Sequence, residues 1–200
     1  MWNLVLEYFS GFLGKLELAA TILLIINVYL IAKQKLVNYF FGFFGVLIYG
    51  YIFLEYKLYS DIGLQWLFYA PLQIYGYYVW KYKGTKGLDS LVPTWLTSKQ
   101  SIFTVATMSV MTLITGYFMS STDASFPYTD AFTTWMSVVA SILLLWKKIE
   151  NWIYWIIMDV VAVYVYYAKE LYVTSGLYVI FLGLATYGLV TWLKESKNNV

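Results

Sequence analysis

Long uncharged stretches, separated by short polar connections, run along most of this chain. Six of them contain no Asp, Glu, Lys or Arg, and a seventh is interrupted only by Asp159. A membrane-spanning helix needs about 20 mostly apolar residues, with a range of about 17–25. The pattern therefore predicts seven spans, near residues 12–32, 36–54, 60–80, 100–120, 129–147, 150–168 and 171–193.

The composition agrees with a chain that lies in a membrane. Of the 200 residues, 61% are hydrophobic and only 12% are charged, whereas a soluble domain carries about a quarter charged residues. We therefore expect one all-α transmembrane domain over residues 1–200, with the lipid bilayer as its partner. Cys and His are absent, so we expect no disulfide, no metal and no cofactor. A net charge of +2 gives no support for a nucleic-acid partner.

The lysines are placed unevenly on the two sides of the predicted bilayer. On one side lie Lys33, Lys35, Lys81, Lys83, Lys86, Lys99, Lys147, Lys148, Lys194 and Lys197, and on the other only Lys15, Lys57 and Lys169. Cytoplasmic loops carry the excess of basic residues. The bias predicts an outward N-terminus and a cytoplasmic C-terminus, which requires an odd number of spans.

The chain also matches itself when it is shifted by 113 residues, the separation between Lys35 and Lys148. The shift places Asn38 on Asn151, and after one gap Trp80 falls on Trp192. Membrane sequences match themselves by chance rather easily, but these matches include polar residues at shared offsets. We interpret them as an internal duplication.

The duplication predicts two three-helix bundles, 12–80 and 129–193, joined by a linker helix at 100–120. This 3+1+3 arrangement leaves both bundles pointing the same way across the membrane. Parallel repeats of this kind occur in transporters, which bind substrate near mid-membrane where the repeats meet. The alternative is that the duplication only builds a scaffold.

Polar side chains within a span are costly and usually face a cavity or the bundle interior. At about 100° per residue, the sixth span places Asn151, Trp155 and Asp159 on one face, with Trp152 at its edge. Asp159 has no lysine deep within any span to neutralise it, so we expect it to be functional. We read Trp155 as part of a cavity wall.

The third span carries a matching stripe that includes Tyr69 and Gln73. Gln73 is expected at a depth similar to that of Asp159, and Pro71 is expected to distort the helix and free a backbone carbonyl nearby. Asn27 in the first span is a weaker candidate for the same cavity, as are hydroxyls of the fifth and seventh spans.

Several of these residues have plainer interpretations. Trp80 and Trp192 lie near span ends, where tryptophan usually anchors the chain at the membrane interface. Asn38 and Asn151 follow lysine-containing loops and could equally cap the starts of their helices.

Aromatic walls beside one carboxylate suit a flat cation, through stacking and cation–π attraction. Amides and hydroxyls add directional contacts for a ribose or an aminopyrimidine. An anionic ligand would need Lys or Arg deep within the membrane, and the predicted spans hold only Lys15 and Lys147, near their ends. Nucleotides and phosphorylated vitamins are therefore disfavoured as substrates.

Four segments resemble the PnuC family of vitamin transporters: 38–42, 74–80, 150–160 and 171–181. Among them, the Glu-Asn-Trp-x-x-Trp element at 150–155 is specific, and the likeness extends over nearly the whole chain. The resemblance implies a seven-helix fold of two three-helix bundles and a linker helix, similar to the SWEET sugar transporters. It implies uncoupled facilitated diffusion across the bacterial inner membrane, followed by trapping by a cytoplasmic vitamin kinase.

The family's binding residues carry over onto Asn151, Trp152 and Trp155, with Gln73 and Tyr77 as contributors from the third span. With the residues chosen from the stripes, the candidate substrate-binding set is Asn38, Tyr69, Gln73, Tyr77, Asn151, Trp152, Trp155 and Asp159.

The resemblance to the family does not clearly favour one of two candidate substrates. Nicotinamide riboside transporters of this family can carry Asn where this chain has Asp159, and a carboxylate suits an aminopyrimidine, so thiamine is slightly favoured over nicotinamide riboside. The rival class is a seven-helix sensor, although the last span lacks the lysine that retinal needs. An enzyme is not expected, because nucleophile and base partners are missing. A homo-oligomer remains open.

Overall fold

The computed structural model describes residues 11–83, 91–122, 126–168 and 172–198. All named elements within these ranges are helices, and the chain forms two compact units, Met1–Ser90 and Leu91–Val200. The helices are α2 (Phe12–Ala32), α3 (Asn38–Glu55), α4 (Tyr59–Gly63), η1 (Leu64–Tyr69), α5 (Ala70–Lys83), α6 (Ser98–Met119), α7 (Pro127–Leu145), α8 (Glu150–Ala168) and α9 (Tyr172–Asn198).

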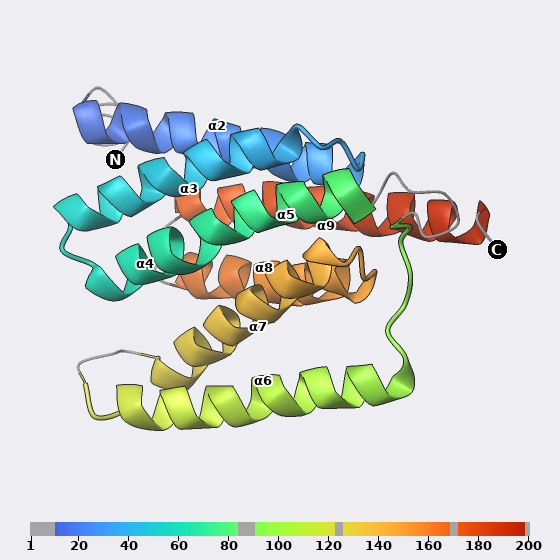
Figure 1. Cartoon of the computed structure of the whole chain (residues 1–200). Helices are drawn as coiled ribbons and strands as arrows, with labels where there is room; N and C mark the ends of the chain where they lie inside the picture. Colours follow the sequence, from blue (N-terminus) through green and yellow to red (C-terminus); the bar gives the residue numbers. More distant parts are fainter. Residues whose placement is uncertain (1–10, 84–90, 123–125, 169–171, 199–200) are drawn as a thin grey trace. The chain divides into compact units, whose positions relative to one another are not determined.

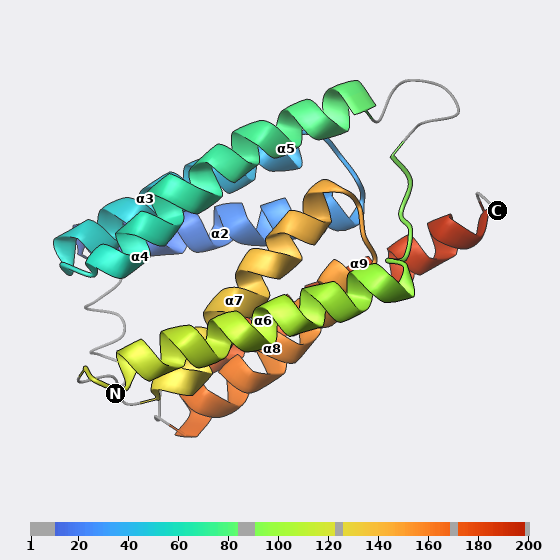
Figure 2. The same cartoon turned by 60° about the horizontal axis from the view of Figure 1, so that its bottom comes forward.

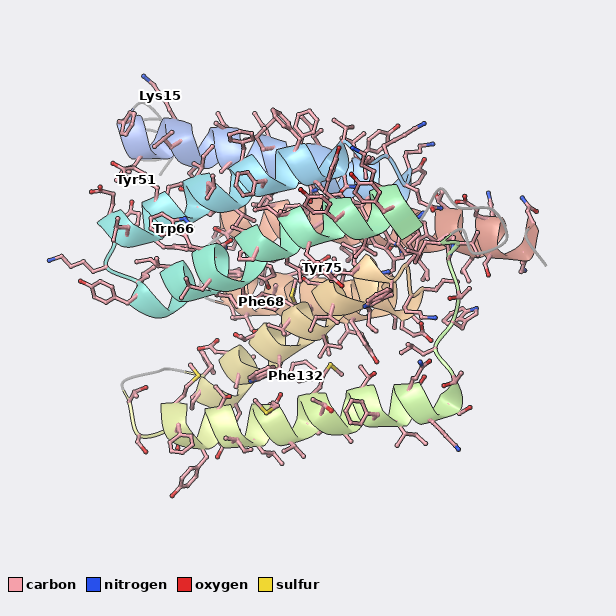
Figure 3. All side chains as sticks on the ribbon, in the orientation of Figure 1. Lys15, Tyr51, Trp66, Phe68, Tyr75 and Phe132 are labelled. Carbon is pink, nitrogen blue, oxygen red and sulfur yellow. The ribbon has the colours of Figure 1, made fainter. Side chains whose placement is uncertain are left out.

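In the first unit, α3 packs against α2 on one side and against α4, η1 and α5 on the other (Figure 1). Glycines on α3 allow this close packing. At Gly50, a Cβ would collide with the indole of Trp66, whose Nε1 donates to the Leu47 carbonyl at 3.3 Å. Figure 3 shows Trp66 on the segment that faces α3.

The third predicted span is not one regular helix. It begins as the short α4, continues through one π-helical segment, η1, and becomes regular again in α5. Pro71 stands at the start of α5 and has no N–H to donate to the carbonyl four residues earlier, at Leu67. The predicted distortion is confirmed, but it lies one turn before Gln73 and not beside it. π-Helical turns often occur at functional sites.

In the second unit, α7 packs against α6 and α8, and α8 packs in turn against α9 (Figures 1 and 2). A capping box starts α6: the Gln100 N–H donates to Thr97 Oγ1, and the Thr97 N–H donates to Gln100 Oε1. An apolar cluster fills the space where α6, α7 and α8 meet. It comprises Met108, Met136, Ala140, Leu143 and Tyr154, with Phe132, labelled in Figure 3, packed against it.

Six of the described helices are long and apolar enough to cross a membrane. They are α2, α3, α6, α7, α8 and the 174–198 part of α9, and their bounds agree closely with six of the predicted spans. The all-α membrane fold is thus confirmed. The predicted linker helix, α6, is part of the second compact unit.

The interpretation of Trp80 and Trp192 as interface anchors is wrong. Trp80 is 5% exposed and Trp192 is fully buried. An anchor must present its ring to lipid headgroups, whereas these rings pack inside their own bundles.

Candidate functional site

The two units contain the same corner, which lies between α2 and α3 in the first unit and between α7 and α8 in the second. The corner residue, Gln34 after α2 and Lys147 after α7, has a positive φ, 51° and 48° respectively. In each case the corner N–H donates to the carbonyl three residues back. The next N–H, of Lys35 or Lys148, reaches the carbonyl five residues back at 2.9 Å. This is the Schellman pattern that ends helices, made here without glycine.

An asparagine closes each corner. The Nδ2 of Asn38 donates to the Lys35 carbonyl at 2.7 Å, and the Nδ2 of Asn151 donates to the Lys148 carbonyl at 2.6 Å. Both asparagines are fully buried. Their Oδ1 atoms have no hydrogen-bond partner among the described residues. The capping interpretation is therefore wrong, because a capping oxygen accepts from an N–H of the helix that it starts. Here the amide nitrogen donates to the corner instead, and the oxygen is a buried acceptor.

Each asparagine is followed by an aromatic residue that packs edge-on against a tryptophan of the bundle's last helix. Tyr39 meets Trp80 with ring centroids 5.2 Å apart, and Trp152 meets Trp192 at 5.4 Å. A glycine makes room for each ring, because a Cβ at Gly76 or at Gly188 would collide with it. Trp152 thus lies at the contact between α8 and α9. Its Nε1 is buried and has no partner among the described residues.

The second corner is also bound by the segment 94–96, which we call the strap. The sequence pattern did not predict this contact. Thr94 pairs with the corner backbone in both directions, donating to the Lys147 carbonyl at 3.2 Å and accepting from the Ile149 N–H at 3.0 Å. The Lys148 ammonium donates to Thr94 Oγ1 at 2.9 Å. The Leu96 N–H donates to Glu150 Oε1 at 2.7 Å. These bonds tie the approach to α6 onto the start of α8.

Lys147 is 9% exposed, which is unusual for a lysine. Burial lowers the pKa of its ammonium, and the charge of Glu195 on α9 opposes that shift. The uneven distribution of lysines in the sequence did not single out Lys147, because a count of charges says nothing about which of them are buried.

Asp159 lies on α8 two turns beyond Asn151 and is 2% exposed. No hydrogen bond or ion pair joins its carboxylate to another residue in the described ranges. A buried charge without a partner is expensive. Asp159 is therefore the strongest candidate in the second unit for contact with a cation.

Trp155 stands between Asn151 and Asp159 on the same face of α8. It is half-buried, with one part of its ring against the cluster formed by Met136, Leu143 and their neighbours. The cluster fixes the indole while leaving part of it uncovered. Its role as a cavity wall remains a prediction.

The third-span candidates lie in the first unit. Tyr69 and Tyr77 are half-buried; the Tyr69 ring meets Phe68 at 5.0 Å, and the Lys81 ammonium lies 5.3 Å from the Tyr77 ring centroid. The π-helical segment ends at Tyr69 and α5 carries Gln73 one turn later. That Gln73 shares a chamber with Asp159 stays a prediction.

The Gln73 carboxamide lies over Gly42 of α3, together with the side chain of Asn27. A Cβ at Gly42 would lie 2.6 Å from Gln73 Oε1 and 2.7 Å from Asn27 Nδ2. Asn27 is 5% exposed and its Nδ2 also donates to the Asn38 carbonyl at 2.8 Å. Sequence analysis ranked Asn27 low and missed Gly42, although Gly42 stands one turn after Asn38.

The described residues hold no group of three Asp or Glu side chains that could bind a metal ion.

Comparison with known proteins identifies relatives over nearly the whole chain. The nicotinamide riboside transporter PnuC of Escherichia coli strain K12 is 27% identical over 210 residues, covering 92% of this chain and 87% of the relative. The protein of the same name from Neisseria mucosa is 26% identical over 187 residues, covering 88% and 70%. A crystal structure of the vitamin B3 transporter PnuC matches with a TM-score of 0.76 at 24% identity, covering 99% of this chain and 89% of that chain.

That likeness confirms the fold, and the relatives identify a multi-pass protein of the bacterial inner membrane. The sequence model of one protein family, described as nicotinamide mononucleotide transporter, matches residues 14–194. This chain belongs to that family, the PnuC transporters.

Proposed function

We propose that this protein carries nicotinamide riboside, a pyridinium nucleoside, across the inner membrane. The observation that carries the proposal is the buried carboxylate of Asp159, one turn from the half-buried indole of Trp155 on α8. A pyridinium ring is flat and positively charged. An indole face attracts such a cation, and a desolvated carboxylate strengthens the attraction.

The relatives change the order of the two substrates. Sequence analysis slightly favoured thiamine because of Asp159, but the relatives are named for nicotinamide riboside and the related solved structure for vitamin B3. Asp159 suits both molecules, since both are cations, so it does not outweigh the relatives. The family's description names the mononucleotide. Its phosphate would require a basic residue, and α8, which carries Trp155 and Asp159, contains none.

We further propose a 3+1+3 arrangement with parallel bundles, in which α6 is the linker. The matched corners of the two units support this, because the same turn, amide bond, aromatic pair and glycine occur in the same order in both. Transport is then uncoupled facilitated diffusion, and phosphorylation by a cytoplasmic kinase retains the vitamin. With no His in the chain, the usual proton carrier is absent.

Counterflow in proteoliposomes tests the substrate. Vesicles loaded with unlabelled nicotinamide riboside should accumulate labelled nicotinamide riboside, and an ionophore should not change the rate. Loading with thiamine or with the mononucleotide should give much weaker accumulation. Stronger counterflow with either of these would overturn the choice of substrate, and a seven-helix sensor would give no accumulation at all.

Asp159→Asn tests the site. Loss of a charge-assisted contact of roughly 1.5–3 kcal/mol should weaken nicotinamide riboside binding about 10- to 100-fold. Binding of the neutral dihydro form of the riboside should change much less. Asp130→Asn, which removes an exposed carboxylate in the first turn of α7, is the matched control and should bind both forms like the parent. Equal losses for the charged and neutral forms would contradict a role for Asp159 in binding the cation.

A further inference from the structure

The two bundles share their corners but differ one turn further along the central helix. Four residues after Asn38, the first bundle has Gly42; four residues after Asn151, the second has Trp155. The same face of equivalent helices thus carries no side chain in one bundle and the largest side chain in the other. A difference of this size at matched positions indicates that the two places have different tasks.

The bare Cα of Gly42 determines where two amides lie. Gln73 Oε1 and Asn27 Nδ2 occupy the place that a methyl group would take, at 2.6 and 2.7 Å from it. Gln73 reaches this place from α5, and Asn27 from α2. Three helices of the first bundle therefore meet in one polar niche, which we define as Asn27, Gly42 and Gln73.

Within the niche, the Asn27 side chain is fixed, whereas the Gln73 side chain can move. Asn27 is almost fully buried, and its bond to the Asn38 carbonyl connects the niche to the corner. Gln73 is half-buried and carries its amide at the end of a flexible side chain. Carboxamides donate and accept hydrogen bonds at once, which suits vicinal hydroxyl groups better than it suits a charged ring.

We propose that Gly42 is a specificity-determining residue: by keeping its Cα bare, it positions the Gln73 and Asn27 amides to bind the sugar hydroxyls of the substrate. This rests on the proposed transport of a riboside. The niche distinguishes a nucleoside from a free pyridinium base.

Gly42→Ala tests the niche by displacement. The new methyl group displaces the ends of two side chains, Gln73 and Asn27, and no backbone atom is among its nearest contacts, so the fold should survive while the amides move. The probes are nicotinamide riboside and 1-methylnicotinamide, a pyridinium cation without a sugar, each titrated calorimetrically into the purified full-length protein. We expect a roughly tenfold loss of riboside affinity, as for one hydrogen bond, and less than a twofold change for 1-methylnicotinamide.

Two further variants separate positioning from damage to the fold. Gly45→Ala places a methyl group against the side chain of Leu24, one turn along the same helix, with no polar side chain among its nearest neighbours. It should leave the ratio of the two affinities unchanged. Gln73→Ala removes the amide and should reproduce the selective loss, and adding Gly42→Ala to it should have little further effect. The Gln73→Ala variant still tests the niche if Gly42→Ala fails to fold.

The outcomes are distinct. A parallel loss for both probes in Gly42→Ala, or no loss for either, would overturn the role of Gly42. A selective loss in Gly42→Ala that persists undiminished in the Gln73→Ala background would show that the glycine does not act through Gln73. If the parent protein binds neither probe, the proposed function itself fails, and the niche with it.

Discussion

Lys147 combines two unfavourable features in one residue: a left-handed backbone and a buried ammonium. A residue with a Cβ loses about 1–2 kcal/mol in that conformation, whereas glycine adopts it readily. The equivalent corner of the first bundle has Gln34, which shares the backbone strain but carries no charge. The pair therefore separates the backbone cost from the cost of burying the charge.

We expect Lys147→Gly to raise the free energy of unfolding by about 1 kcal/mol from the backbone, as Gln34→Gly should. Lys147→Gly should gain more than Gln34→Gly at neutral pH, because it also removes the buried charge. Burial lowers the native pKa of Lys147 below its ordinary value of 10.5. Between the two pKa values the unfolded chain binds more protons, so the parent gains stability as the pH rises and the extra advantage of Lys147→Gly shrinks.

Thermal unfolding in detergent at neutral and alkaline pH measures this difference. Equal gains for the two glycine variants at neutral pH would mean that the charge of Glu195 fully offsets the cost of burying the Lys147 ammonium.

At the scale of single residues, a side chain that is rare within a membrane could be recognised from the sequence. A carboxylate at Asp159 could be singled out because no apolar helix carries one without cause. Gly42 could not, because glycine is frequent in membrane helices and its role depends on which side chains of other helices come to lie over it. Trp80 and Trp192 were misassigned for a related reason: position near a span end does not say which way a ring points.

At the scale of elements, α8 and α9 pack closely at Gly188, where an added Cβ would lie 2.5 Å from the ring of Trp152. Gly188→Ala should cost about 1–3 kcal/mol of stability, since the methyl group and a rigid indole cannot share the space. Gly183→Ala on the same helix has no atom within 4 Å of the added Cβ. It should be neutral or stabilising by up to about 1 kcal/mol through helix propensity. Denaturation of the purified variants compares the two directly, and equal stabilities would contradict this packing.

Helix bounds followed from the sequence because charges end membrane helices where the bilayer ends. The bounds of α2, α6 and α8 agree with the predicted spans 12–32, 100–120 and 150–168 to within a few residues. The π-helical segment before Pro71 and the strap around Thr94 did not follow. Both depend on where backbone donors and acceptors find partners, which the hydropathy pattern does not contain.

At the scale of the whole molecule, the duplication links the fold to the proposed function. Positions where the two bundles agree, at the corners and the aromatic pairs, hold each bundle together. Positions where they differ hold the candidate binding residues, amides in the first bundle and an indole and a carboxylate in the second. The same corner and the same aromatic pair therefore support a different set of candidate contacts in each bundle.

The orientation predicted from the lysines has its own test at the two ends of α6. The chain contains no Cys, so a single cysteine is a unique label. Ser98→Cys and Ser121→Cys are nearly isosteric changes at exposed positions, at the first residue of α6 and just beyond its last. Because ten of the thirteen lysines fall on the predicted cytoplasmic side, Ser121→Cys should react with a membrane-impermeant maleimide in intact spheroplasts. Ser98→Cys should react only in inverted vesicles. The reverse pattern would invert the whole topology, and labelling of both from one side would mean that α6 does not cross the membrane, which would remove the linker from the 3+1+3 arrangement.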